Sequence, residues 1–162
     1  MAEHVGLDNL RSYFKGIHRA LRPGGLYLHH AIVRPGKSRQ ANRRTKRPEF
    51  EALTRYIFPG GELDTIGRTV TNLETTGFEI HDVEGWREHY QRTCRHWHDR
   101  LLSQMDAAIA EVGSVKARVW LMYLAGCSLA FARNSVGLYQ TLASKRVKGA
   151  SGLPPTRADL YR

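Results

Sequence analysis

Two side chains stand out as groups that could do chemistry. His30 lies in the apolar run 26–33, and Tyr90 lies in a helical pattern that begins at Arg87. An imidazole can hold an anion or move a proton near neutral pH, and a phenol can donate a hydrogen bond. On residue type alone, His30 is more often a satisfied core histidine and Tyr90 a plain core aromatic. Both interpretations stay open for these two residues.

A metal site is suggested by the spacing of Cys94 and His98. They lie four residues apart on the same predicted helix, so they share one face, and such a pair can bind zinc. His89 and His96 are close in sequence, but they do not share that face, and no Cys-x-x-Cys motif accompanies them. We therefore expect no metal site.

The charge of the chain points to polyanionic partners. Its net charge is +10, and seven of its lysines and arginines fall between Arg34 and Arg47, with no acidic residue among them. Nucleic acid, anionic lipid headgroups and acidic substrates all suit such a surplus. Two cysteines make no disulfide framework, and the polar first residues show no signal peptide, so we expect a cytoplasmic protein.

Apolar spacing and turn residues predict an α/β fold. A helix over about 7–21 ends at Arg22-Pro23-Gly24-Gly25. The strand that follows is apolar on both faces except for its histidines, as in a sheet covered by helices on both sides. The uncharged run 119–131 is too short to span a bilayer and predicts a buried core helix. The other expected elements are a loop over 34–47, helices from Pro48, over 67–76, 87–112 and 114–133, and strands over 78–84 and within 136–145.

This order of elements fits the second half of an α/β sheet. We expect one domain over residues 1–148, followed by a flexible tail over 149–162 that is rich in glycine and proline. A strand at 26–33 without a neighbour on one side would leave a long apolar edge, which is an aggregation hazard unless it is covered.

Six phrases then place the chain beside a known family. The most specific are Phe58-Pro59-Gly60-Gly61 and His89-Tyr90-Gln91-Arg92-Thr93. In order, the set resembles the C-terminal half of the cyclopropane-fatty-acyl-phospholipid synthase family, which includes the mycolic acid cyclopropane synthases. The remaining phrases are Glu3-His4-Val5-Gly6, the Pro-Gly-Gly turn with His30-Ala31-Ile32, residues 77–84, and residues 118–127 with Phe131 and Tyr139-Gln140.

The resemblance implies a fold and a reaction. The fold is the C-terminal half of a class I, Rossmann-like sheet of an S-adenosylmethionine (SAM) methyltransferase, with helical insertions. The family's Gly-rich SAM loop and acidic ribose ligand lie upstream of the matched region, so the SAM-binding half is expected to be absent. The family transfers the SAM methyl group to a cis double bond of a lipid acyl chain, and the resulting carbocation loses a proton and closes to a cyclopropane.

The resemblance also implies site residues. By position, Glu3, His30 and Tyr90 match the side chains that hold a bicarbonate ion, which serves as the proton acceptor, and Ile32 offers its backbone amide. No residue of the chain matches the cofactor-binding set. The expected partners are an unsaturated fatty-acyl phospholipid or related lipid and, where the two halves are separate chains, an N-terminal half. The chain alone is expected to be inactive.

An alternative hypothesis is a non-catalytic basic module that binds nucleic acid or an anionic membrane surface. It depends on the net charge and on Arg34–Arg47, which in a lipid-modifying enzyme would also suit peripheral contact with the inner face of the membrane. No nucleic-acid-binding motif accompanies this segment, and aromatic residues do not interleave with it. The favoured interpretation therefore includes no nucleic acid.

Overall fold

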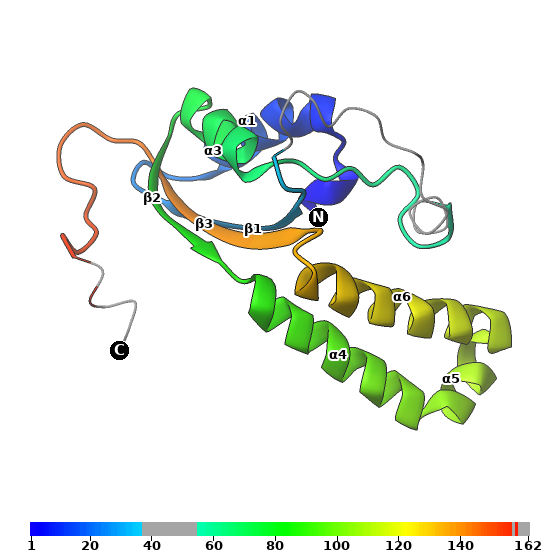
Figure 1. Ribbon diagram of the computed structural model, residues 1–162. Helices are drawn as coiled ribbons and strands as arrows, with labels where there is room; N and C mark the ends of the chain where they lie inside the picture. The colour runs from blue at the N-terminus through cyan, green and yellow to red at the C-terminus, as the bar shows by residue number, and fades with distance from the viewer. Residues whose placement is uncertain (37–54, 157, 159–162) are drawn as a thin grey trace.

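The computed structural model describes residues 1–36, 55–156 and 158. Most of the basic segment, and the helix expected from Pro48 except for its end at residues 55–57, lie outside the described residues. The described chain is a three-stranded sheet with two helices on one face and a helical hairpin at one end (Figure 1). Its elements are the short 3₁₀ helices η1 (Ala2–His4) and η2 (Leu7–Asn9), then α1 (Leu10–Ala20), β1 (Leu26–Val33), α3 (Ile66–Thr75), β2 (Phe78–Gly85), α4 (Arg87–Ser103), α5 (Met105–Val112), α6 (Ser114–Ala132) and β3 (Gly137–Lys145).

The last strand lies in the middle of the sheet. The strand order is β1-β3-β2, and β3 runs antiparallel to both neighbours, which makes β1 and β2 parallel to each other. The register pairs Leu26 with Ser144 and His30 with Gln140, and it places a bulge in β2 between Ile80 and Asp82. The helix–strand order therefore follows the prediction, and a late strand inserts between two earlier ones.

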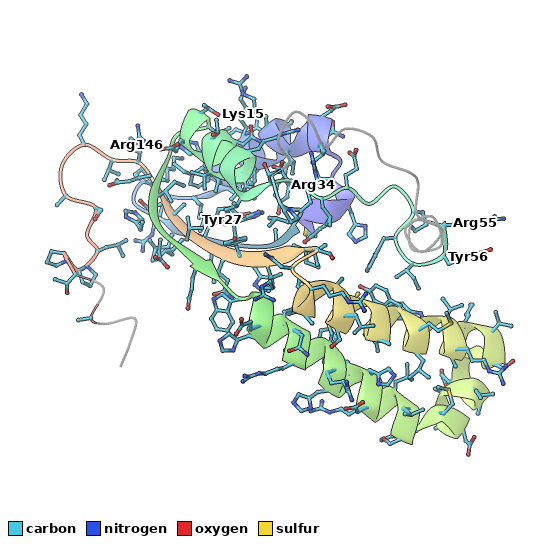
Figure 2. The ribbon with its side chains drawn as sticks, in the orientation of Figure 1. Lys15, Tyr27, Arg34, Arg55, Tyr56 and Arg146 are labelled. Carbon is cyan, nitrogen blue, oxygen red and sulfur yellow. The ribbon has the colours of Figure 1, made fainter. Side chains whose placement is uncertain are left out.

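One face of the sheet is covered by α1 and α3 (Figure 1). Phe14 on α1 and Leu73 on α3 are fully buried, and they pack with Phe78 at the start of β2. Figure 2 shows Tyr27 of β1 on the sheet and Arg34 where the chain leaves β1. Alternation along β1 directs Tyr27, His29, Ala31 and Val33 to this covered face.

Among the described residues, the opposite face is covered only at one end, where α4 and α6 meet the sheet. Cys94, Phe131 and Leu138 form a buried cluster there, and Ile32 packs against it. Further along β1, Leu26 and Leu28 are 52% and 55% exposed. The prediction that both faces of this strand are covered along its length is therefore wrong for the described residues, because Leu26 and Leu28 remain exposed.

The helical hairpin differs from the prediction in two ways. The single helix expected over 87–112 breaks at Gln104, whose φ of −123° and ψ of 31° are not helical. The helix α6 is long and apolar enough by length and composition to cross a membrane, but it packs along α4. It is not a fully buried core helix either, because Met122 and Val115 are each 75% exposed.

Candidate functional site

The carboxylate of Glu3 lies at the outer edge of β1. Its Oε1 accepts a hydrogen bond from the backbone N–H of Ile32 at 2.8 Å, and its Oε2 pairs with the Met1 ammonium at 2.9 Å. Burial raises the pKa of Glu3, but hydrogen bonds from the Ile32 and Glu3 amides, together with the Met1 charge, outweigh it and lower the pKa overall. Two of the predicted site groups are therefore brought together, with the carboxylate ionised.

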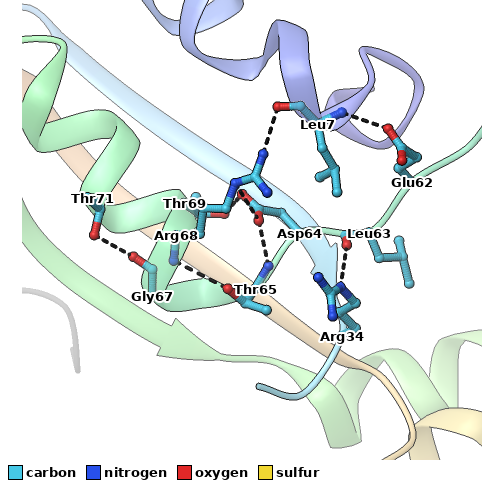
Figure 3. A network of polar contacts seen from close by, with 10 residues as sticks. All are labelled: Leu7, Arg34, Glu62, Leu63, Asp64, Thr65, Gly67, Arg68, Thr69 and Thr71. Carbon is cyan, nitrogen blue, oxygen red and sulfur yellow. Dashed lines mark hydrogen bonds and ion pairs between the residues drawn. The ribbon is translucent and has the colours of Figure 1, made fainter. Parts of the chain in front are cut away.

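A polar network holds the N-terminal segment against β1 (Figure 3). Glu62 accepts a hydrogen bond from the backbone N–H of Leu7 at 2.8 Å, and its own N–H donates to the carbonyl oxygen of Glu3 at 2.9 Å. Arg68 donates to the carbonyl oxygen of Leu7 at 2.8 Å and lies 3.5 Å from Asp64. The hydrogen bonds from residues 62–68 thus hold the first ten residues in place and fix the position of Glu3.

The buried carboxylate of Asp64 anchors this network. It accepts hydrogen bonds from the Thr65 N–H at 2.8 Å and the Thr69 hydroxyl at 3.2 Å, at the start of α3. The backbone of Asp64 also bonds to that of Arg34, just beyond β1, and the Arg34 guanidinium donates to the carbonyl oxygen of Leu63 at 3.0 Å (Figure 3). The end of β1 and the start of α3 are therefore joined at this point.

The two adjacent histidines of β1 lie on opposite faces. His29 is 5% exposed, packs edge-on against Phe14, and its Nδ1 shares a hydrogen bond with the Tyr27 hydroxyl at 2.9 Å. Burial lowers the pKa of His29, which favours the neutral ring at neutral pH. His30 is exposed on the other face. In the described residues it is therefore not the satisfied core histidine that its apolar strand suggested, and His29 has that place.

His30 has a cross-strand partner in β3. The Gln140 side chain lies directly opposite in the register, and its amide nitrogen is 3.2 Å from His30 Nδ1. If that amide donates to Nδ1, the proton of the neutral ring sits on Nε2, which is then free to donate. Sequence reasoning missed Gln140 as a positioning residue, although the phrase Tyr139-Gln140 contributed to the family resemblance.

Tyr90, on the first turn of α4, faces His30. The ring centroids are 6.1 Å apart with an interplanar angle of 68°, and the Tyr90 ring also packs edge-on against Phe131 at 5.2 Å and Trp97 at 5.8 Å. Burial raises the pKa of Tyr90, and the neighbouring Cys94, Cys127 and Glu3 raise it further. The phenol of Tyr90 thus keeps its proton and remains a hydrogen-bond donor, and the negative charge of Glu3 contributes to this effect.

The structure therefore brings the predicted residues together in two pairs, Glu3 with the Ile32 amide and His30 with Tyr90. The described residues do not close a bicarbonate-sized pocket around them. A cavity of about 10 Å³, room for roughly one water molecule, touches Glu3 and Ile32, but it lies on the His29 side of the sheet. The bicarbonate roles of these residues remain predictions.

The spacing of Cys94 and His98 does not produce a metal site in the described part of the chain, where no group of three or more His, Cys, Asp or Glu side chains could hold an ion. His98 Nδ1 instead lies 2.9 Å from Asp99, and Cys94 packs inward in the cluster with Phe131 and Leu138. The two side chains thus face different partners.

Comparisons with known proteins bear on the family and the fold. Residues 1–141 match the mycolic acid cyclopropane synthetase family. The chain is 39% identical over its whole length to a probable fatty acid methyltransferase from Pseudomonas putida, of which it covers 41%. The solved structure of the cyclopropane synthase MmaA2 from Mycobacterium tuberculosis superposes with a TM-score of 0.79 at 28% identity, over 88% of this chain and 52% of that one. A structure of mycolic acid cyclopropane synthase CmaA1 complexed with SAH and CTAB gives a TM-score of 0.78 at 25% identity.

The strand order, the helices and these matches define a methyltransferase fold, as predicted. The chain belongs to the mycolic acid cyclopropane synthetase family. It spans less than half the length of the curated relative from P. putida and about half of the solved structures, and it corresponds to their later part.

Proposed function

We propose that this chain supplies the later part of a SAM-dependent methyltransferase that acts on cis-unsaturated acyl chains of phospholipids, in the manner of a cyclopropane synthase. The observation that carries the proposal is the pairing of His30 with Tyr90, beside Glu3 and Ile32, in a chain of this family. Bound SAM would supply the methyl group, and a bound bicarbonate would accept the proton that the alkylated chain loses.

The donor set of the site suits a small oxyanion in part. The phenol of Tyr90 is a donor facing His30, and His30 Nε2 is a second donor when the Gln140 amide donates to Nδ1. The Ile32 amide is already bonded to Glu3 at 2.8 Å, so an ion would have to share that N–H or displace the carboxylate. We assign the holding of the ion to His30 and Tyr90, and to Glu3 the acceptance of the hydroxyl proton of bicarbonate.

The groups that hold SAM are proposed to come from a segment that precedes the matched region in the longer relatives, either in the same polypeptide or as a separate chain. Two features suit such a neighbour. The outer edge of β1 has no strand beside it over Leu26–Ile32 in the described residues, and Leu26 and Leu28 present apolar surface next to that edge. Covering this surface would remove an aggregation hazard and close a wall beside His30.

The basic segment retains its proposed role at the surface of the membrane. Arg34–Arg47 would meet anionic headgroups from the cytoplasmic side, each cation contributing about 1 kcal/mol near the surface. Vesicle co-sedimentation at rising salt, with Arg43, Arg44 and Arg47 neutralised, tests this. Duplex binding lost on the same changes would instead favour the basic-module alternative.

The test of the proposed function is reconstitution. The chain is expressed alone and also joined behind the preceding segment of the P. putida relative, and methyl transfer from labelled SAM to vesicles of cis-monounsaturated phospholipid is measured. We expect no transfer by the chain alone and transfer by the joined protein, with the product identified by mass spectrometry as a ring or a methyl branch. Transfer by the chain alone would show that it is not inactive.

Site variants are then compared in the joined protein. Removing one donor from an oxyanion site costs about 100-fold in rate, so Tyr90→Phe and His30→Ala should each lower turnover on that order. His96→Ala, an exposed histidine on the same helix as Tyr90, is the matched control and should leave turnover unchanged. A joined protein that folds and binds SAM but methylates no lipid would refute the function itself.

A further inference from the structure

The only two cysteines of the sequence come together between two helices. Cys94 on α4 and Cys127 on α6 are 33 positions apart, and both are free. These helices pack along each other, and Cys127 packs against the buried cluster formed by Cys94, Phe131 and Leu138. Tyr90 and Ile32 pack against the same cluster. The two sulfurs thus lie next to residues of the candidate site, although nothing in the proposed function uses them.

The two thiols are not equivalent. A side-chain hydrogen bond from Cys94 lowers the pKa of Cys127, and a second one from the Tyr123 hydroxyl lowers it further, against the opposing effect of burial. The same hydrogen bond, together with burial, raises the pKa of Cys94. Cys94 is 2% exposed, whereas Cys127 is only half-buried. The accessible thiol is therefore the one that ionises more readily, and the buried thiol keeps its proton beside it.

We propose that Cys94 and Cys127 form a peroxide-sensitive thiol pair that closes to a disulfide between α4 and α6. The packing of the two side chains in one cluster carries this inference, with Cys127 as the nucleophile and Cys94 as the resolving thiol. It goes beyond the proposed function, because it concerns thiol chemistry that requires neither SAM nor lipid.

The chemistry balances with hydrogen peroxide as the oxidant. The Cys127 thiolate attacks one peroxide oxygen, an S–O bond forms, the O–O bond breaks, and hydroxide leaves, which gives a sulfenic acid. The Cys94 sulfur then attacks the Cys127 sulfur, an S–S bond forms and the S–O bond breaks. The hydroxyl leaves as water with the proton of Cys94, so two thiols are oxidised and one peroxide is reduced to water.

The experiment treats the folded chain of residues 1–162 with hydrogen peroxide and maps its thiols by mass spectrometry without reduction. We expect the tryptic peptide Thr93–Arg95 to be joined to Val119–Arg133 within one chain, and a dithiol reductant to separate them. In Cys94→Ser, dimedone should trap a sulfenic acid on Cys127. In Cys127→Ser, the remaining thiol should react about tenfold more slowly than Cys127 does, because it is buried and protonated.

Three results would overturn the inference: both thiols surviving peroxide at concentrations that oxidise free cysteine, oxidation of Cys127 to sulfinic acid without a link to Cys94, or a disulfide that joins two chains instead of two helices. Circular dichroism checks that each serine variant folds. Should one of them not fold, the peptide map of the unmodified chain still decides the outcome.

Discussion

Replacing Glu3 should destabilise the fold by an amount that the hydrogen bonds of its carboxylate predict. Its side chain is 19% exposed and accepts the Ile32 N–H at 2.8 Å. A hydrogen bond to a charged group contributes about 1.5–3 kcal/mol and a neutral one about 0.5–1.5 kcal/mol. Glu3→Gln, which keeps the acceptor but not the charge, should therefore cost about 1 kcal/mol, and Glu3→Ala about 2 kcal/mol. For a chain of this size, 1 kcal/mol lowers Tm by about 3 °C.

The pH dependence separates this account from a loss of packing. The folded pKa of Glu3 is lowered, so its carboxylate contributes stability above the pKa of the unfolded chain, and that contribution is lost as the pH falls through the folded value. The gap between the wild-type chain and Glu3→Gln should be full at pH 7 and should close progressively below about pH 4.3, the ordinary value for glutamate.

Urea unfolding followed by circular dichroism at a series of pH values measures this gap. Glu74→Gln is the matched control, because Glu74 is an exposed carboxylate on α3 and its change should leave the free energy of unfolding within about 0.5 kcal/mol of the wild type. If Glu3→Gln is as stable as the wild type at pH 7, or if the gap is the same at pH 7 and pH 3, the carboxylate does not hold the edge of β1 as described.

Three further predictions follow from single contacts. Asp64→Ala should lower the free energy of unfolding by about 1–3 kcal/mol in urea titrations, because it leaves the buried Thr69 hydroxyl without its acceptor; equal stability would contradict this. Burial lowers the pKa of His29, so the unfolded chain binds its proton first as the pH falls below about 6.5, and His29→Asn should flatten the loss of stability between pH 7 and pH 5. Gly77→Ala should lower Tm, since its φ is +101° and the added Cβ would lie 2.9 Å from His18; an unchanged Tm would show that the turn rearranges freely.

Local sequence signals predicted the strands and most helices because their boundaries are fixed by nearby residues. The Pro-Gly-Gly turn marks the start of β1 at Leu26, and Gly77 marks the start of β2 at Phe78. No glycine or proline marks the break at Gln104, so the sequence pattern predicted a single helix over 87–112. The extent to which the neighbouring elements cover β1 depends on tertiary packing, which is why Leu26 and Leu28 were expected to be buried.

The candidate site was predictable residue by residue but not as an arrangement. The phrases of the family supplied Glu3, His30 and Tyr90, which are separated by up to 87 positions in the sequence. Only the fold shows that β3 places Gln140 directly opposite His30, and that the backbone N–H of Ile32 donates a hydrogen bond to Glu3. These are contacts between distant segments, and no local spacing encodes them.

The bond from Ile32 to Glu3 gives this carboxylate a structural consequence that is separate from any role toward a bound ion. An edge strand offers unpaired N–H groups to any other strand, and a charged side chain at the edge opposes such pairing. Glu3 occupies one of these groups, at the end of β1 where the site lies, whereas the exposed Leu26 and Leu28 lie at the other end. A turnover assay of Glu3 variants alone could therefore not distinguish a lost role in the reaction from a lost hydrogen bond at the edge of β1. His30 and Tyr90, which take no part in that edge contact, are the positions that test the chemistry by itself.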